Sequence, residues 1–439
     1  MTEEKKLIDF IKKSPSCFHV VKNFENELSN KGFEKLEEGK KWNIRRGGKY
    51  FVTRNSSSIL AFAIPETGID SGFMITASHS DSPSFKIKAN PEMKSAGCVK
   101  LNVEKYGGML INPWFDRPLS LAGRVIYKKA DSKGQTVLAQ KLVNVDRDLL
   151  MIPNLAIHMN RDANDGHKID VQGEVCPVLS LNEDTKLMPI VAKAADVKEK
   201  DIADADLFLV CRSEGCIWGA ENEFISSPKL DDIECAFTTM NAFEAACENL
   251  SSLSKVPVCC VFDNEEVGSG TRQGADSTLL GDTLMRIFAA LNKGNVDFES
   301  YNIALAKSFM VSADNAHAVH PNYVNSADPV NRPVINGGIV IKFNAAQKYT
   351  TDALSSAFFK NVCEKAGVPV QVFTNNSNVA GGSTLGNISQ AHVSIPCVDI
   401  GLAQWAMHSP YETAGKKDVS YMIKAITEFY KSPFEIIIE

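Results

Sequence analysis

The chain has 439 residues, of which 44% are hydrophobic and 23% are charged, and its formal net charge is −6. This length exceeds one ordinary core, so we expect two domains of a globular protein. The slight acidic excess argues against nucleic-acid binding, which needs a basic surface. We find no signal peptide and no apolar run long enough to cross a bilayer, so we expect a cytoplasmic protein with no membrane partner.

Eleven cysteines are scattered along the chain without a C-x-x-C pair. A zinc ribbon or a thioredoxin-type site is therefore not expected. In a cytoplasmic protein these thiols should be free and mostly buried. Any metal ion would have to be held by histidines and carboxylates.

The predicted elements change character twice along the chain. Residues 1–85 predict two helices and then short buried strands, the last at 73–77. Residues 86–227 predict mainly β-strands, with a hairpin turn at 131–134 and helical periodicity only in a charged stretch around 193–203. From residue 228 onward, strands alternate with helices near 234–250, 276–292, 351–366 and 418–431.

This alternation predicts an α/β fold, in which a mixed sheet carries helices on both faces. The sheet would belong to a discontinuous domain of residues 1–86 and 228–439. A β-rich insertion of residues 87–227 would interrupt it.

Several predicted strands end in His, Asp or Glu. The polar segments in question are 78–81, 263–266, 313–317 and 401–408. Open α/β sheets bind ligands at the carboxyl ends of their strands, so these side chains should meet in one crevice. Their carboxylates would repel one another unless cations were present. Two divalent ions about 3.5–4 Å apart would remove that repulsion, and histidine and carboxylate are suitable zinc ligands.

Two short motifs suggest individual roles. His79 and Asp81 point to the same side of an extended strand end, so the histidine can bind a metal while Asp81 holds its other ring nitrogen. Glu265 and Glu266 point differently, so one can bind a metal while the other takes a proton from metal-bound water. Singly, an H-x-D is usually a solvated turn and a Glu pair an exposed face. The coincidence of several strand ends favours the metal site.

Other catalytic or nucleotide-binding motifs are not supported. Residues 267–274 faintly resemble a dinucleotide-binding loop, but the glycine spacing is wrong and the preceding carboxylates would repel a pyrophosphate. We find neither a P-loop nor a G-x-S-x-G elbow.

As a set, the motifs resemble the aspartyl aminopeptidase family, in order along nearly the whole chain. The segments that carry the resemblance are 77–83, 107–108, 113–117, 153–158, 229–232, 263–269, 312–322, 382–386 and 406–409. The resemblance implies that His79, Asp231 and Asp314 hold one metal ion and that Asp231, Glu266 and His408 hold the other. It also implies Glu265 as general base and Asp81 as the partner of His79.

The resemblance further implies a metallopeptidase domain interrupted by a dimerisation domain, and homo-oligomers, namely tetrahedral dodecamers built from dimers. His158 would reach a neighbouring subunit's active site, while Lys342 and Tyr349 would lie near the substrate. Two ions per subunit are expected, zinc first, with cobalt or manganese as alternatives. Two positions depart from the family: Asp232 replaces the usual Asn, and Asn387 replaces a frequent Pro.

We therefore expect an aminopeptidase that removes N-terminal residues from peptides. Metal ions lower the pKa of bound water to about 7; Glu265 would take the proton, hydroxide would attack the scissile carbonyl, and Glu265 would return the proton to the leaving amine. An N-terminal Asp or Glu would be preferred if Lys342 faces the first side chain.

The alternatives are a broad or neutral-residue aminopeptidase, a deacetylase or carboxypeptidase with the same two-metal site, and a non-catalytic assembly shell. A shell should have lost the ligand residues, which are all present. His167 and His392 are expected to be ordinary histidines. Trp114, Phe115 and residues 151–158 are apolar enough for an interface, with buried core as the alternative.

Overall fold

The computed structural model describes residues 1–66, 72–292 and 294–435. Within these residues the largest feature is a nine-stranded mixed sheet in the order β1-β2-β3-β13-β4-β14-β18-β16-β17. Its strands are β1 (Glu34–Leu36), β2 (Lys49–Arg54), β3 (Ser58–Ala63), β4 (Phe73–His79), β13 (Val256–Phe262), β14 (Phe309–Ala313), β16 (Ile339–Phe343), β17 (Val370–Thr374) and β18 (Cys397–Gly401). The central strands β13, β4, β14 and β18 are parallel, so their carboxyl ends meet at one edge.

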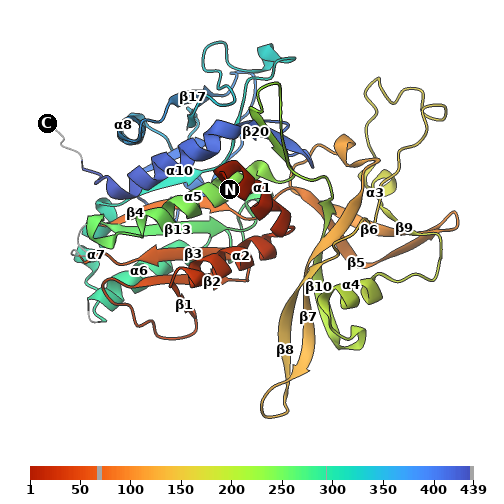
Figure 1. Ribbon diagram of the computed structural model, residues 1–439, viewed down its shortest axis with the longest axis horizontal. Coiled ribbons are helices and arrows are strands. Elements are labelled where there is room, and N and C mark those ends of the chain that lie inside the picture. Colours follow the sequence, from red (N-terminus) through yellow and green to blue (C-terminus); the bar gives the residue numbers. More distant parts are fainter. Residues whose placement is uncertain (67–71, 293, 436–439) are drawn as a thin grey trace.

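Helices cover both faces of this sheet (Figure 1). The helices are α1 (Glu3–Lys13), α2 (Cys17–Asn30), α5 (Leu230–Ala246), α6 (Leu279–Leu291), α7 (Phe298–Ala306), α8 (Ala353–Ala366), α9 (Leu385–Ser389) and α10 (Lys416–Lys431). Strand residues alternate between two cores: Ile59 and Ala61 pack with α1, α2, α5, α8 and α10, whereas Leu60 and Phe62 pack with α6, α7 and α9. Both faces are thus buried, which accounts for the uninterrupted apolar run of β3.

A six-stranded antiparallel sheet lies to one side of the nine-stranded sheet (Figure 1), in the order β8-β7-β10-β5-β6-β9 within the described residues. Its strands are β5 (Ser84–Ser95), β6 (Cys98–Tyr106), β7 (Leu119–Ala130), β8 (Thr136–Asn144), β9 (Val178–Ser180) and β10 (Ile202–Cys211), accompanied by the helices α3 (Val171–Glu174) and α4 (Leu187–Ala195). The predicted turn at 131–134 joins β7 to β8, where the Gly134 N–H donates to the Asp131 carbonyl.

A smaller five-stranded sheet, in the order β11-β12-β20-β19-β15 within the described residues, brings distant segments together. Its strands are β11 (Cys216–Trp218), β12 (Phe224–Ser227), β15 (Ala316–His317), β19 (Ala403–Trp405) and β20 (Glu412–Gly415). β12 leads directly into α5, and the loop between β19 and β20 carries His408. This sheet therefore fixes the start of α5 beside that loop.

The structure changes one sequence expectation and decides one open alternative. The helical stretch expected around 193–203 begins earlier, as α4, and ends where Asp196 adopts a left-handed φ of 50°. Trp114 is buried against Phe85, with ring centroids 5.3 Å apart, so it is a core residue, not an interface residue. By contrast, Leu155 and Ile157 are exposed in the single chain. No helix in the described ranges combines the length and apolar character that a membrane span requires.

Candidate metal site and substrate cavity

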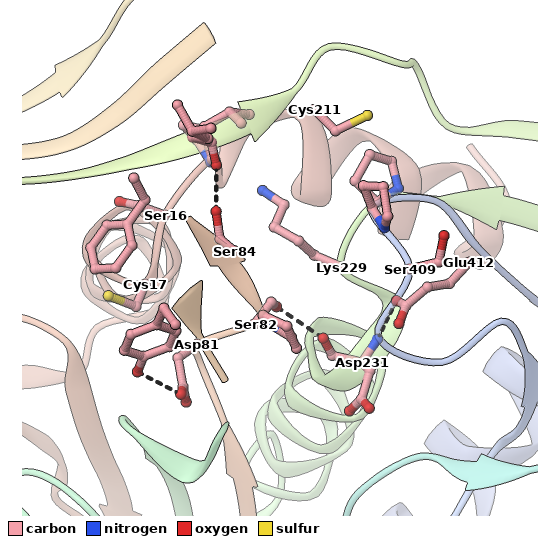
Figure 2. A pocket seen from close by; sticks show the side chains of 18 of the residues that line it. Ser16, Cys17, Asp81, Ser82, Ser84, Cys211, Lys229, Asp231, Ser409 and Glu412 are labelled. Carbon is pink, nitrogen blue, oxygen red and sulfur yellow. Dashed lines mark hydrogen bonds between the residues drawn. The ribbon is translucent and has the colours of Figure 1, made fainter. Parts of the chain in front are cut away.

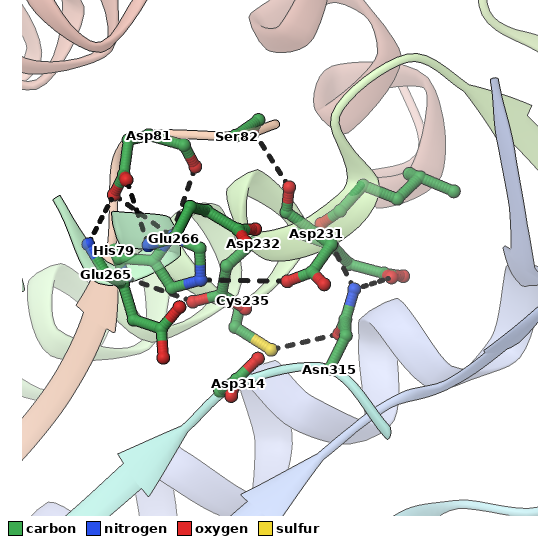
Figure 3. A network of polar contacts seen from close by, with 12 residues as sticks. His79, Asp81, Ser82, Asp231, Asp232, Cys235, Glu265, Glu266, Asp314 and Asn315 are labelled. Carbon is green, nitrogen blue, oxygen red and sulfur yellow. Dashed lines mark hydrogen bonds and ion pairs between the residues drawn. The ribbon is translucent and has the colours of Figure 1, made fainter. Parts of the chain in front are cut away.

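The predicted ligand residues come together at the carboxyl edge of the nine-stranded sheet. His79 closes β4, the 3-10 turn η5 (Glu265–Val267) follows β13, and Asp314 follows β14. Asp231 lies in the first turn of α5. Figure 3 shows the carboxylates of Asp231, Glu265 and Asp314 around one space. The structure therefore brings these side chains from separate strand ends close together.

His79 is oriented as the H-x-D spacing predicts. Its Nδ1 lies 3.3 Å from a carboxylate oxygen of Asp81 and 3.1 Å from the Asp81 carbonyl oxygen. Its Nε2 is left facing Asp231, at 3.7 Å from Oδ1. Asp81 also accepts hydrogen bonds from the backbone N–H groups of Glu265 and Glu266, both at 3.2 Å. One buried carboxylate therefore aligns the histidine and the glutamate pair together.

Asp231 lies between two groups of candidate ligands. Its Oδ2 lies 3.4 Å from His408 Nε2, which is also 3.4 Å from Glu266 Oε2. The sets of ligand-type atoms that lie within 4.8 Å of one another are His79–Asp231–Asp232–Asp314, His79–Glu265–Glu266 and Asp231–Glu266–His408. Asp232, at the position that departs from the family pattern, accepts the His79 backbone N–H at 3.0 Å through Oδ2.

The buried carboxylates of this site lack enough positive charge and enough hydrogen-bond donors around them. Burial raises the pKa of Glu265 to about 8, and repulsion from Asp314 and Asp81 adds to the effect. Burial and the charge of Asp231 raise the pKa of Glu266 well above its usual range. Asp231 Oδ1 and Glu266 Oε1 are buried without a hydrogen-bond partner among the described residues. Buried carboxylate oxygens without donors suit divalent cations, so this donor set fits zinc.

A cavity of about 200 Å³ opens beside these residues. Lys342 and Tyr349, the two residues that we expect near the substrate, both line it. The Lys342 ammonium donates to the Asp314 carbonyl at 2.7 Å and lies 3.4 Å from the Asp314 carboxylate. Burial alone would lower the pKa of Lys342, but the Asp314 carboxylate raises it, so the lysine is charged. His317, which the sequence analysis did not single out, lines the same cavity, and burial lowers its pKa.

Glu412 is a second residue that sequence reasoning missed. Its side chain is 1% exposed, and its two oxygens accept the backbone N–H groups of Asp231 at 3.0 Å and His408 at 2.7 Å. Glu412 therefore links the α5 ligand to the ligand from the β19–β20 loop. A single glutamate at the start of a short strand has no sequence signal that predicts such contacts.

Behind Asp231 lies another hollow, of about 50 Å³, into which Lys229 extends (Figure 2). The Lys229 ammonium donates to the Ser14 carbonyl at 2.5 Å, and Ser82 Oγ donates to the Asp231 carbonyl at 2.9 Å. The turn between α1 and α2 and the chain entering β5 therefore both hold the segment that carries Asp231.

The remaining predicted residues lie elsewhere. His158 is on an exposed segment between β8 and α3 and does not line the cavity of its own subunit. His167 pairs with Glu174 at 2.8 Å, and His392 pairs with Asp276 at 2.7 Å. Neither of these two histidines lies in a group of candidate ligands within the described residues.

An α/β sheet that gathers histidines and carboxylates beside a cavity is the architecture of a metallopeptidase. The model of the aminopeptidase I zinc metalloprotease family (M18) matches residues 10–430. The chain belongs to this M18 family, whose members are aminopeptidases that hydrolyse peptides.

Individual proteins of known sequence and structure are also similar to this chain. A probable M18 family aminopeptidase 2 from Clostridium novyi (strain NT) is 47% identical over 433 residues, covering 97% of each chain. One from Pseudomonas aeruginosa (strain UCBPP-PA14) is 38% identical over 438 residues, again covering 97% of each. A chain in the Ape4 and Nbr1 complex has a TM-score of 0.92 and 35% identity, covering 98% of this chain and 85% of that one. The mApe1 dodecamer of baker's yeast has a TM-score of 0.86 and 28% identity, covering 98% and 96%.

Proposed function

We propose that this chain is an aminopeptidase that works with two divalent metal ions per subunit and that these ions are zinc. The observation that carries the proposal is the position of Asp231 between two donor groups, one containing His79 and Asp314 and the other Glu266 and His408. Such a bridging carboxylate is the usual device for holding two ions side by side. Cobalt or manganese would suit the same oxygen and nitrogen donors.

Bound zinc would supply a Lewis acid that polarises the scissile carbonyl. The chain supplies the rest. Glu265 does not belong to the two ligand groups that contain Asp231. It acts as general base: it takes a proton from the attacking water and passes that proton to the leaving amine. Asp81 fixes the orientation of both His79 and the Glu265–Glu266 turn. The α-amine of the substrate binds beside the carboxylates, which limits cleavage to the first peptide bond.

Acidic substrates are the proposed preference, because Lys342 is charged and lines the cavity beside Tyr349. The Lys342 ammonium already interacts with the Asp314 carboxylate and carbonyl. Its preference for an acidic substrate side chain should therefore be smaller than that of an ammonium without such partners. A charge-assisted hydrogen bond contributes about 1.5–3 kcal/mol, and we place this site at the low end, about tenfold in kcat/KM. The neutral-residue aminopeptidase is the remaining alternative.

The test compares aspartyl, glutamyl, leucyl and lysyl anilides with N-acetyl-aspartate and a peptide with a blocked N-terminus. Hydrolysis of the free-amine substrates alone supports the aminopeptidase. Hydrolysis of N-acetyl-aspartate would instead support a deacetylase, and release of C-terminal residues from the blocked peptide a carboxypeptidase. Lys342→Met should remove the acidic preference, measured as the ratio of aspartyl to leucyl kcat/KM, because a loss that acts through the Asp314 contact lowers both rates alike. Faster cleavage of the leucyl substrate by the wild type, unchanged by the substitution, would instead indicate a broad-specificity enzyme.

We also propose that residues 87–227 form an inserted assembly domain and that subunits form dodecamers built from dimers. Exposed Leu155 and Ile157 beside His158 support an interface there. In this assembly His158 would complete a neighbour's cavity. His158→Ala should lower turnover without loss of metal, and a fully active monomer in sedimentation and assay would refute the assembly role.

A further inference from the structure

Two walls of the substrate cavity come from irregular segments that hold no candidate metal ligand. One is the segment after β16 that carries Tyr349. The other is the segment before α9 that contributes Gly382, Ser383 and Thr384. Neither segment lies within a strand or helix, although Thr384 is the N-cap residue of α9. Side-chain contacts therefore contribute to the position of both segments.

One buried carboxylate contacts both segments. Asp399 lies in β18 and is 0% exposed. Its Oδ1 accepts the hydroxyl of Thr384 at 2.7 Å, and its Oδ2 accepts the backbone N–H and the hydroxyl of Thr350 at 2.5 and 2.6 Å. Its own backbone N–H donates to the Thr351 hydroxyl at 2.9 Å. Thr350, which follows Tyr349, and Thr384, which follows Ser383, are thus both hydrogen-bonded to the Asp399 carboxylate.

A second contact acts on the same wall. Asn387 Oδ1 accepts the Ser383 hydroxyl at 2.7 Å and the Thr384 backbone N–H at 3.2 Å. The space behind is full, since a Cβ on Gly386 would lie 3.0 Å from both Asp399 Oδ1 and the Ser312 Cβ. The Thr384 segment therefore rests against β14 and β18 with little freedom to shift.

A carboxylate in the interior must be hydrogen-bonded, so a purely structural role for Asp399 is the first explanation to consider. The segments from which its hydrogen-bond donors come point to an additional, positioning role. Among the described residues, its carboxylate accepts hydrogen bonds from Thr384, which lines the cavity, and from Thr350, which directly follows the lining residue Tyr349 on another segment. The Asp399 carboxylate therefore connects the segment that carries Tyr349 to the segment that carries Thr384, in addition to being satisfied within the core.

We infer that Asp399 is a positioning residue that sets the width of the substrate cavity by holding the Tyr349 and Thr384 walls on one carboxylate, with Asn387 fixing the second wall. The inference rests on the proposed function, because the cavity is assigned to the N-terminal residue of a peptide. Loss of the clamp loosens substrate binding and leaves the metal-binding side chains in place.

The first test pair is Thr384→Val and Thr384→Ser. Valine keeps the shape but removes the hydroxyl that Asp399 accepts, whereas serine keeps that hydroxyl. We expect Thr384→Val to raise KM for aminoacyl anilides about tenfold with kcat within about threefold, and Thr384→Ser to restore the wild-type KM. Zinc content should match the wild type in both variants, and Tm should fall only in Thr384→Val, which leaves the buried Asp399 Oδ1 without this donor.

Asn387→Ala and Asn387→Asp provide an independent pair, because aspartate keeps the acceptor oxygen. Alanine should raise KM and aspartate should not. A fall in kcat with unchanged KM and a lowered Tm, in the valine and alanine variants alike, would show a structural role only and overturn the inference. Wild-type KM in both variants would overturn it as well. Failure of the proposed function is a separate result, since the wild type itself would then not cleave the anilides.

Discussion

Glu412→Gln tests how the metal site is held together. In the structure one carboxylate accepts the backbone N–H groups of Asp231 and His408, which come from different segments. Glutamine offers one oxygen, so one N–H must face an amide N–H₂ group in a buried site. A hydrogen bond to a charged acceptor contributes about 1.5–3 kcal/mol. We expect that loss to appear mainly as weaker metal binding, because the partners are the backbones of two proposed ligands.

A loss of this size corresponds to about 10–100-fold in metal affinity, which is typical for residues that orient metal ligands. The assay is competition for zinc against a chromophoric chelator, on Glu412→Gln and on a control, Glu364→Gln, which changes an exposed glutamate of α8. The control should bind zinc as the wild type does. Unchanged affinity in Glu412→Gln, with both ions retained, would show that Glu412 does not position the ligands.

Three further outcomes follow from the site and its surroundings. Glu265→Gln should lose about 10²–10⁴-fold in kcat and keep its metal, and near-normal turnover would remove Glu265 from the mechanism. Asp231→Ala should lose both ions by elemental analysis, whereas His408→Ala should weaken one; two tightly bound ions in the Asp231 variant would disprove bridging. Burial and the nearby Glu244 raise the pKa of Glu27 from 4.5 to about 7, so the folded state binds more protons and stability falls as pH rises through that range. Glu27→Gln should therefore stabilise by about 1–2 kcal/mol at pH 8, after allowance for solvent screening, and little at pH 4.5; equal effects at both values in denaturant unfolding would contradict this.

Sequence reasoning succeeded where a periodic pattern and a chemical motif coincide. The apolar run at 256–262, which precedes the polar segment 263–266, forms strand β13. Its end places Glu265 and Glu266, and the end of β4 places His79. The parallel arrangement of these strands made their meeting predictable. The strand at 395–400 led to the segment that ends in His408, whereas the position of Asp231 came from the family resemblance alone, because Asp231 does not follow a strand of the central sheet.

The missed residues share a physical reason. Glu412 and Asp399 act by accepting hydrogen bonds from backbone groups and hydroxyls far away in the chain, and no local pattern encodes such partners. Trp114 was ambiguous because an aromatic side chain suits a core and an interface equally well. The contact with Phe85 shows that Trp114 belongs to the core. That contact exists only once the six-stranded sheet, which contains Phe85, has formed.

The central claim is a site with two metal ions and an activity that depends on them. The most direct measurement is elemental analysis of the purified protein together with aspartyl-anilide hydrolysis, before chelation, after chelation and after stepwise return of zinc. The account predicts two zinc ions per subunit, loss of hydrolysis in the metal-free protein, and recovery that is complete only when both ions have returned. Full activity of the metal-free protein, or saturation of metal binding and activity at one ion per subunit, would contradict it.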